Sequence, residues 1–504
     1  MDGHTTTTTY PDTGITTQTL DDNGMLLQLT DQLGRTTKHQ YDVNRNEIKR
    51  TNALGEVTTY AYDANGNQTS ATNALGETTT TTYNAFSEPL TTTNPIGNTT
   101  TIAYDDNGLP TSFSDSMGPL AAFTSSEHGL PLTVTDAAGN TVFLSYDEAG
   151  DLIHRTDRLG RITTYTYTGF GQKETVTDPR GGLTRYAYDF ADRLTFKILP
   201  AGNGWLLNLD QNGLAFQRST TDAQRGDFFT YDAANHLVDT QHLTDDGSHI
   251  RHVQDFRGNE LSTTDEAGHT TSHTYDLAGQ LVQTTYPDGT VTSQTLDALG
   301  RLASKTDERG NTMTYAYEAG CDCTDRMTSV TDPLGRTTAM TYDGMSRKTS
   351  MTDANGHQTV YVYDLRGQLV ETDYADETAT HDTYDALGRR IASSDQTGAT
   401  THYGYDAEGQ LTSVTDPLGN LTQYGYDGNG NLTSVTDANN HTTTYAYDAS
   451  NRKISRTLPL GMTETFAYDE ADNVTSHTDF RGKTTMYNFD RRYPTGRQFP
   501  RRAG

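Results

Sequence analysis

Pairs of tyrosine and aspartate are the residues of this sequence with the clearest capacity for chemistry. They recur along the chain, as at Tyr62-Asp63, Tyr405-Asp406 and Tyr426-Asp427. Aromatic faces and carboxylates together suit carbohydrate, so one interpretation is a repeated sugar-binding surface. The other is structural: the tyrosines pack along one face and the aspartates close turns. We favour the structural interpretation, because the pairs recur throughout the chain whether or not a ligand is present.

Two patterns could hold a metal ion. Cys321-Asp322-Cys323 could bind a metal or form a strained disulfide, but structural zinc needs four ligands and the sequence has no second cysteine pair. Clusters of aspartate, asparagine and glycine at residues 63–67 and 427–431 could form calcium-binding loops. An EF-hand loop needs glycine at position 6 and glutamate at position 12, where the first cluster has Gln68 and Ala74. We therefore expect turns, and neither a metal nor a cofactor.

Other candidate motifs are short or incomplete. Arg225-Gly226-Asp227 matches an integrin-type tripeptide, and a group of histidines lies near the single tryptophan, Trp205, with no carboxylate at metal-ligand spacing. The histidines are His236, His242, His249 and His252. Residues 481–484 end like a phosphate-binding loop, but position 477 is histidine rather than glycine. We find no catalytic motif and predict that the chain is not an enzyme.

Composition narrows the class of protein. The 504 residues carry a net charge of −29, which argues against nucleic acid or an anionic membrane surface as partner. Only 32% of residues are hydrophobic, yet 30 tyrosines, 15 phenylalanines and abundant threonine favour strands rather than disorder. No apolar run is long enough for a transmembrane helix, so we expect no membrane insertion. The start of the chain has no recognisable signal peptide.

The Tyr-Asp pairs mark a repeat of 21 residues. One unit, YDAEGQLTSVTDPLGNLTQYG at residues 405–425, contains two D-x-x-G segments, and aspartate and glycine at these places are typical of turns. We predict about 23 units over residues 1–490, with irregular register at 199–260, an insertion near 318–325 and an off-pattern, arginine-rich tail at 491–504. The repeat signature comprises Tyr62, Asp63, Gly66, Tyr104, Asp105, Gly108, Tyr146, Asp147, Gly150, Tyr188, Asp189, Tyr363, Asp364, Gly367, Tyr405, Asp406, Gly409, Asp416, Gly419, Tyr426, Asp427, Gly430, Tyr447 and Asp448.

The runs between turns have six or seven residues, too short for helices and rich in β-branched and aromatic residues. Each unit therefore predicts a two-stranded hairpin, and consecutive units predict an antiparallel meander. Roughly 46 strands at about 4.8 Å would give a ribbon on the order of 220 Å wide, which must curl. The low apolar content cannot fill a packed interior. We predict an all-β ribbon that spirals into a partial hollow shell; a β-solenoid or propeller is the alternative.

The pattern YDxxGxLxxxTDxxGxxTxYxY recurs along nearly the whole chain and resembles the Rhs/YD-repeat family. That family includes bacterial Rhs proteins, wall-associated proteins, shell components of insecticidal toxin complexes and the teneurin extracellular region. The resemblance implies a β-sheet strip wound into a cocoon. In Rhs effectors and toxin complexes the cocoon encloses a variable C-terminal toxin, whereas in teneurins the shell supports cell–cell adhesion. YD repeats have also been associated with carbohydrate binding.

The resemblance predicts a structural shell segment that encapsulates or displays a toxin or effector polypeptide. The alternative is a secreted or cell-surface adhesin whose partners are glycans or proteins. Effector-type members carry a self-cleaving core segment after the repeats and then a toxin domain, and neither is recognisable here. We therefore expect this chain to be a fragment of a longer protein, and no catalytic residue is carried over from the family.

Overall fold

The computed structural model describes residues 4–10, 13–202, 204–210, 214–220, 226–231, 237–242, 249–320, 326–469 and 472–487. Within these residues every regular element is a β-strand, and there are 46 strands. They have three to eight residues each, as expected for the short runs between D-x-x-G turns. The predicted all-β class is confirmed.

The strands are, in chain order, β1 (His4–Thr9), β2 (Ile15–Leu20), β3 (Leu26–Thr30), β4 (Thr36–Tyr41), β5 (Glu47–Thr51), β6 (Val57–Tyr62), β7 (Gln68–Thr72), β8 (Thr78–Tyr83), β9 (Pro89–Thr93), β10 (Thr99–Tyr104), β11 (Pro110–Asp115), β12 (Gly118–Ser125), β13 (Pro131–Asp136), β14 (Thr141–Tyr146), β15 (Leu152–Thr156), β16 (Ile162–Tyr167), β17 (Lys173–Thr177), β18 (Leu183–Tyr188), β19 (Leu194–Ile198), β20 (Gly204–Leu209), β21 (Ala215–Thr220), β22 (Gly226–Tyr231), β23 (Leu237–His242), β24 (His249–Gln254), β25 (Glu260–Thr264), β26 (Thr270–Tyr275), β27 (Leu281–Thr285), β28 (Val291–Leu296), β29 (Leu302–Thr306), β30 (Thr312–Tyr317), β31 (Met327–Thr331), β32 (Thr337–Tyr342), β33 (Lys348–Thr352), β34 (Gln358–Tyr363), β35 (Leu369–Asp373), β36 (Ala379–Tyr384), β37 (Arg390–Ser394), β38 (Thr400–Tyr405), β39 (Leu411–Thr415), β40 (Leu421–Tyr426), β41 (Leu432–Thr436), β42 (Thr442–Tyr447), β43 (Lys453–Thr457), β44 (Thr463–Tyr468), β45 (Val474–Thr478) and β46 (Thr484–Met486).

Each strand pairs antiparallel with the strand that follows it in sequence, so the chain forms one continuous meander. In the unit described above, β38 pairs with β39 and β39 pairs with β40. The same order holds at the two ends of the array, where β1 pairs with β2 and β45 with β46. The predicted antiparallel hairpin ribbon is therefore the observed topology.

Two kinds of turn alternate along the ribbon and lie on its two opposite edges. The Tyr-Asp turn follows an even-numbered strand, as at residues 406–410, and the Thr-Asp turn follows an odd-numbered strand, as at residues 416–420. Both close in the same way: Asp406 N–H donates to Gln410 O (3.0 Å) and Asp416 N–H to Asn420 O (3.0 Å). The fourth residue of each has a positive φ, 86° at Gly409 and 84° at Gly419, which glycine adopts without steric cost.

Only one of the two turns regularly distorts the ladder. Hairpins closed by a Tyr-Asp turn shift register at the terminal residue of the even strand, as between Gly404 and Tyr405. The Thr-Asp hairpin β39–β40 keeps its register throughout. A bulge bends the strand and increases its right-handed twist. A bulge in each Tyr-Asp hairpin therefore gives the ribbon a bend that recurs with every unit.

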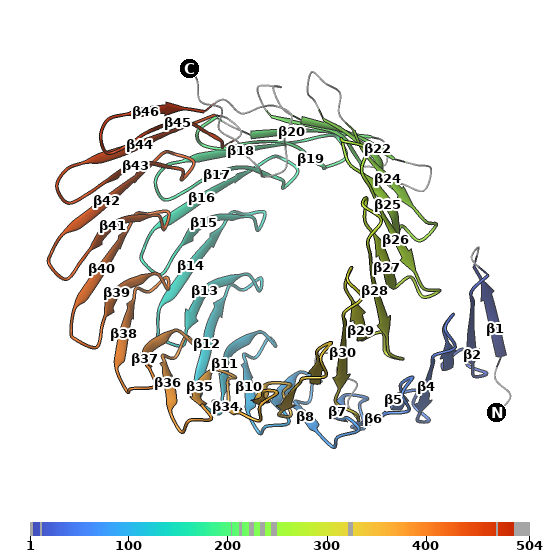
Figure 1. The fold of residues 1–504 in the computed structure, drawn as a ribbon. Coiled ribbons are helices and arrows are strands. Elements are labelled where there is room, and N and C mark those ends of the chain that lie inside the picture. Colours follow the sequence, from blue (N-terminus) through green and yellow to red (C-terminus); the bar gives the residue numbers. More distant parts are fainter. Residues whose placement is uncertain are drawn as a thin grey trace.

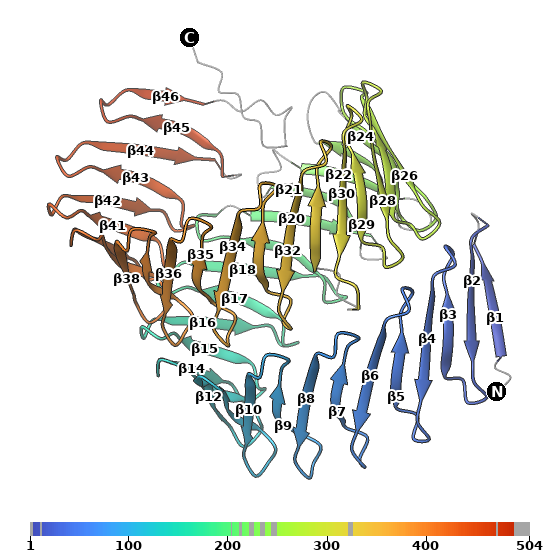
Figure 2. The same cartoon turned by 60° about the horizontal axis from the view of Figure 1, so that its bottom comes forward.

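The accumulated bend winds the ribbon into a coil that passes over itself. In Figure 1 the ribbon runs from β1 through β10, rises along β12–β18, crosses at β19–β22, descends along β24–β29 and reaches the bottom of the view at β30. Figure 2 shows the strands from β32 onward lying in a second tier beside the first. We call β1–β20 the first coil and β25–β46 the second coil. The sheet edges at β1 and β46 are not joined to each other.

The wall of this coil is a single sheet thick. Among the described residues Val142 is the only buried hydrophobic side chain. The accessible surface is 28611 Å², whereas a compact protein of 55.3 kDa would expose about 18,000 Å². Even-numbered strands alternate between half-buried and exposed positions, as in β6, where Tyr60 and Tyr62 lie on the half-buried face. The predicted partial shell, rather than a packed core, is therefore the observed architecture.

Candidate functional site

The feature that converts a ribbon into a wall is the seam where the second coil meets the first. Thr-Asp turns of the first coil contact Tyr-Asp turns of the second coil. Contacting residues lie about 250 positions apart in sequence. For example, the backbone N–H of Arg158 donates to Glu408 Oε1, with 2.5 Å between nitrogen and oxygen. No sheet hydrogen bonds cross this boundary in the described strands, so side chains and turn backbones hold it together.

One deeply buried contact of the seam is centred on Arg326. Its guanidinium donates to both carboxylate oxygens of Glu77 in the first coil, each at 2.9 Å, and to Glu318 at 3.1 Å. The side chain of Arg326 is only 3% exposed. A bidentate guanidinium–carboxylate pair has a fixed geometry, so this contact sets the register of one coil on the other as well as joining them.

A second bidentate pair lies further along the seam. Arg366 of the second coil donates to the two oxygens of Asp115 in the first coil at 2.8 and 3.0 Å. The Asp115 side chain is 3% exposed. The hydrogen bonds from Arg366 lower the pKa of Asp115, and those to Asp115 raise the pKa of Arg366. Both groups therefore stay charged near neutral pH.

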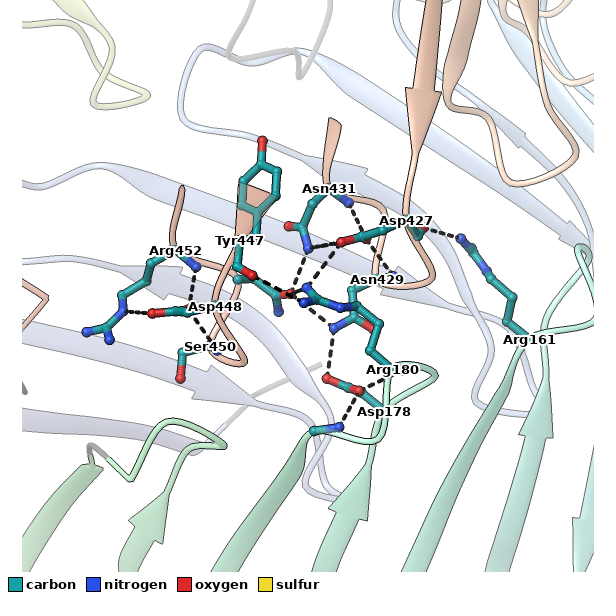
Figure 3. Close-up of polar contacts among 12 residues, drawn as sticks. Arg161, Asp178, Arg180, Asp427, Asn429, Asn431, Tyr447, Asp448, Ser450 and Arg452 are labelled. Atoms are coloured by element: carbon teal, nitrogen blue, oxygen red, sulfur yellow. Dashed lines mark hydrogen bonds and ion pairs between the residues drawn. The ribbon is translucent and has the colours of Figure 1, made fainter. Parts of the chain in front are cut away.

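Figure 3 shows a third group of polar contacts, where the first-coil turn at Asp178 meets two second-coil turns. Arg180 reaches Asp427 Oδ2 at 3.1 Å and the carbonyl of Tyr447 at 3.4 Å. Asn429 Nδ2 donates to Asp178 Oδ2 at 2.8 Å. Burial alone would raise the pKa of Asp427, but hydrogen bonds from Asn431 and the charge of Arg180 hold that pKa below its usual value.

The two coils also approach closely enough to restrict residue size. An added Cβ at Gly344 would lie 3.0 Å from Pro95 Cβ, and one at Gly428 would lie 3.5 Å from Pro179 Cβ. Neither glycine has a positive φ. The small size of Gly344 therefore serves the close approach of the coils and not the conformation of the turn, whereas the contact at Gly428 has an ordinary van der Waals length.

The signature tyrosines join neighbouring hairpins. Each lies at the end of an even-numbered strand, and several donate from the hydroxyl to the carbonyl 15 residues earlier, as Tyr426 does to Leu411 O at 2.9 Å. The same bond is made by Tyr62, Tyr104, Tyr188 and Tyr405. Burial raises the pKa of Tyr146, Tyr363 and Tyr447. At the bonded positions, the proton of the tyrosine hydroxyl is therefore used within the fold.

The signature aspartates lie at the first position of their turns. Asp63 Oδ1 accepts from the backbone N–H groups of Asn65 and Asn67, both at 2.9 Å. The backbone N–H group four residues after the aspartate makes the same hydrogen bond at the other signature positions: Asp105, Asp147, Asp189, Asp364, Asp406, Asp416, Asp427 and Asp448. The glycines three residues later have positive φ: Gly66, Gly108, Gly150, Gly367, Gly409, Gly419 and Gly430.

One recurrent residue was missed in the sequence. An arginine four positions after the turn aspartate binds that aspartate and then reaches the next unit. Arg347 Nε donates to Asp343 Oδ2 (2.7 Å), and its Nη1 donates to the Asp364 carbonyl (2.7 Å). Its guanidinium lies 4.9 Å from the centre of the Tyr363 ring. Arg389 and Arg452 repeat all three contacts. The D-x-x-x-R spacing is a signal that could have identified these arginines.

The remaining sequence candidates do not form a common site. Cys321, Cys323, Arg225 and His236 lie outside the described residues. His252 accepts or donates one hydrogen bond with Glu260, at 2.9 Å, while His242 and His249 lie in β23 and β24 and Trp205 in β20. The described residues contain no group of three or more His, Cys, Asp or Glu side chains placed to hold a metal ion. The two calcium candidates, Asp63 and Asp427, use their carboxylates to accept turn and asparagine N–H groups.

Within the described part of the chain, no helix has the length and apolar character needed to cross a membrane.

A single-layered ribbon of Tyr-Asp hairpins, coiled and joined along a turn-to-turn seam, defines a repeat-built β-shell. The family profile described as RHS Repeat matches nine segments of the sequence: 21–57, 46–78, 62–101, 146–182, 257–291, 324–358, 384–421, 426–461 and 454–484. Together they cover more than half of the chain. The chain belongs to the RHS repeat family.

Solved structures support the same fold. The chain is similar to the structure described as "TcdB2-TccC3 without hypervariable C-terminal region", with 16% identity, a TM-score of 0.58 and 94% of this chain covered. It is also similar to the "TcdB2-TccC3-TEV" structure, with 15% identity, a TM-score of 0.60 and 97% of this chain covered. The matches cover 35% and 36% of those chains, so this chain spans about a third of their length. A comparison with curated protein sequences finds no match.

Proposed function

We propose that this chain is a wall segment of an Rhs-type shell, and that the shell encloses or displays a toxin or effector polypeptide. The observation that carries the proposal is the wall itself: one sheet thick, bent in every unit and joined to its own preceding coil by buried ion pairs. Such a wall leaves an interior to be occupied by another polypeptide instead of filling it with its own side chains.

The mechanism is exclusion. A continuous wall keeps a foldable or active polypeptide away from proteases and from the surrounding solution until the wall opens. The seam is the part of the wall held without sheet hydrogen bonds, so its ion pairs determine whether the wall is closed. One of the similar structures is of a complex that lacks a hypervariable C-terminal region, and a polypeptide of that kind is the proposed occupant. We further propose that the shell is secreted and has no catalytic role.

The test uses the full-length gene product that contains this chain. It is treated with a nonspecific protease, and the fragments that survive are identified by mass spectrometry. We expect a polypeptide from outside the repeat array to survive in the parent protein. The combined change Arg326→Ala and Arg366→Ala should make that polypeptide sensitive, because it opens two buried contacts of the seam.

The matched control is Arg336→Ala. Arg336 lies in a Thr-Asp turn of the second coil, its side chain is 66% exposed, and it takes no part in the seam. We expect this control to protect the polypeptide as the parent does. Digestion of everything except the repeat array in the parent would contradict enclosure. Specific binding of the intact chain on a glycan array would instead favour the adhesin.

A further inference from the structure

Six Tyr-Asp turns in the described part of the chain have a residue other than glycine at their fourth position. These residues keep the positive φ that the glycines adopt, with values between 61° and 70°. A Cβ strains the backbone in this region, so a side chain that stays there is expected to make contacts that offset the strain. The six residues are Arg45, Ser87, Asp192, Ser346, Asn451 and Asp472.

Five of these side chains bond to the preceding turn. Each accepts a hydrogen bond from a residue 20 positions earlier, which closes the preceding turn on the same edge of the ribbon. Ser87 Oγ, for example, accepts from Asn67 Nδ2 at 3.1 Å. Arg45 cannot make this bond, because a guanidinium has no acceptor. The fourth-position oxygen is therefore a link between neighbouring turns. The other four bonds run from Gln172 to Asp192 (2.7 Å), Arg326 to Ser346 (3.0 Å), Asn431 to Asn451 (2.7 Å) and Arg452 to Asp472 (3.0 Å).

Ser346 makes this link inside the seam. Arg326 is buried, and its Nη1 and Nη2 atoms donate to Glu77 and Glu318. The third nitrogen of the guanidinium, Nε, donates to Ser346 Oγ at 3.0 Å. A buried N–H group that loses its acceptor destabilises the structure, because water does not replace the lost partner. Ser346 therefore completes the hydrogen bonds of this guanidinium and fixes the direction in which it points at Glu77.

Asn451 makes the link at another point of the seam, where it contacts both coils. Its Oδ1 accepts from Arg180 Nη1 of the first coil at 3.2 Å. The same oxygen accepts from Asn429 Nδ2 at 3.0 Å and from Asn431 Nδ2 at 2.7 Å, both in the neighbouring turn of the second coil. Arg180 also reaches Asp427 Oδ2 of that turn, at 3.1 Å. A glycine at position 451 would suit the turn, but it would offer no oxygen to the three donors.

We propose that Ser346 and Asn451 are positioning residues of the seam. Their side-chain oxygens hold Arg326 and Arg180 in the orientation in which these arginines bridge the two coils, and the strained φ is retained for that reason. Glycine at the same position of other turns, such as Gly409, shows that the turn itself does not need these side chains. The inference deepens the proposed function and rests on it in one respect, that the seam closes the wall.

The test compares Ser346→Gly with Ser346→Ala in the full-length gene product that contains this chain. Both changes remove the Oγ acceptor, but only the glycine also relieves the strain of the positive φ. In a urea series followed by small-angle X-ray scattering, we expect both variants to expand at a lower urea concentration than the parent protein. Hydrogen exchange of the amides in β32 and β33, which this turn joins, should be about fivefold slower in the glycine variant than in the alanine variant. Asn451→Gly should also expand at a lower urea concentration than the parent.

The matched control is Ser87→Gly, a change of the same residue type at the same turn position, where φ is 66° and the bonded partner Asn67 lies in the same coil. This control should expand at the urea concentration of the parent. Ser346 variants that expand as the parent does, while Arg326→Ala expands earlier, would overturn the proposal and leave the proposed function standing. An effect of Ser87→Gly equal to that of Ser346→Gly would also overturn it, because glycine would then act through the turn alone. Protease protection measures enclosure separately, so a failure of enclosure would not change these outcomes.

Discussion

At the scale of single residues, the two members of the Tyr-Asp pair bond to different parts of the ribbon. The tyrosine hydroxyl reaches back to the preceding hairpin, as from Tyr426 to Leu411 O, while the aspartate closes the turn that follows, as Asp427 does with Asn429 and Asn431. One dipeptide thus links three consecutive strands. That dual use explains why the pair recurs in many units without a ligand.

The tyrosine hydroxyl can be tested alone. Changing Tyr426→Phe removes the bond to Leu411 O and leaves the ring in place, so we expect a local loss of about 0.5–1.5 kcal/mol. Hydrogen exchange of the amides in β39 and β40 measures it. The control is Tyr424→Phe in the same strand, because the Tyr424 hydroxyl makes no hydrogen bond within the described residues. Equal exchange in the two variants would contradict a role for the Tyr426 hydroxyl.

At the scale of elements, the hairpin is specified by its turns, and the two turns differ in one respect. Both use an aspartate or a similar residue at the first position and a positive φ at the fourth. The Tyr-Asp hairpins add a bulge, as between Gly404 and Tyr405, whereas the Thr-Asp hairpin that follows has none. The ribbon therefore bends at the edge where the Tyr-Asp turns lie. At this edge the tyrosine hydroxyl bonds the bulged strand to the hairpin before it.

The positive φ at the fourth turn position predicts which substitutions destabilise a hairpin. Gly419 has a φ of 84°, and a Cβ there would meet nothing within 4 Å, so a substitution would strain only the backbone. We expect Gly419→Val to destabilise the β39–β40 hairpin by about 1–2 kcal/mol, as measured by urea unfolding or hydrogen exchange. Gly419→Asn should have a smaller effect, because Asn440 and Asn451 already adopt φ values of 63° and 64° at this position. A valine variant as stable as the asparagine variant would contradict this account.

At the scale of the whole molecule, stability has two sources. Neighbouring hairpins hold one another in the manner of repeat proteins, where each unit contacts only its neighbours. The seam adds contacts between residues about 250 positions apart, such as Arg326 with Glu77. Losing the seam should leave the ribbon folded while the coil opens, so shape and secondary structure can be followed separately.

Acid should open the seam in this way. The folded pKa of Asp115 lies below its ordinary value of 3.8 because of its hydrogen bonds from Arg366. Its stabilising effect is therefore fully present above pH 3.8 and is lost as the pH falls through the lowered folded pKa. We expect small-angle X-ray scattering to show expansion in that acidic range while circular dichroism still reports strands.

The comparison variant is Arg366→Gln, which leaves the buried Asp115 carboxylate without its cation and should weaken the seam by about 1–3 kcal/mol. We expect this variant to expand at a higher pH than the parent. The control Arg336→Gln, in an exposed Thr-Asp turn of the second coil, should expand in the same range as the parent. An identical response of all three proteins would show that the pair of Arg366 and Asp115 does not hold the seam.

Much of the fold can be predicted from the sequence because the residues that determine it act locally. The 21-residue step, the D-x-x-G segments and the short β-branched runs each act within one unit, and together they specify strands, turns and pairing order. The excess of polar residues likewise excludes a packed core. The bulge and the arginine of the D-x-x-x-R spacing are local too, and they were missed because the signature was defined by tyrosine, aspartate and glycine alone.

Only the tertiary structure determined which turns meet. The partners Arg326 and Glu77, or Arg366 and Asp115, belong to units that look alike in sequence, and their meeting depends on how much each unit bends and twists. Small angles summed over about twelve units set that result, and no single unit encodes it. The sequence by itself therefore determined the ribbon, and the coil decided the seam, because curvature accumulates over the whole array.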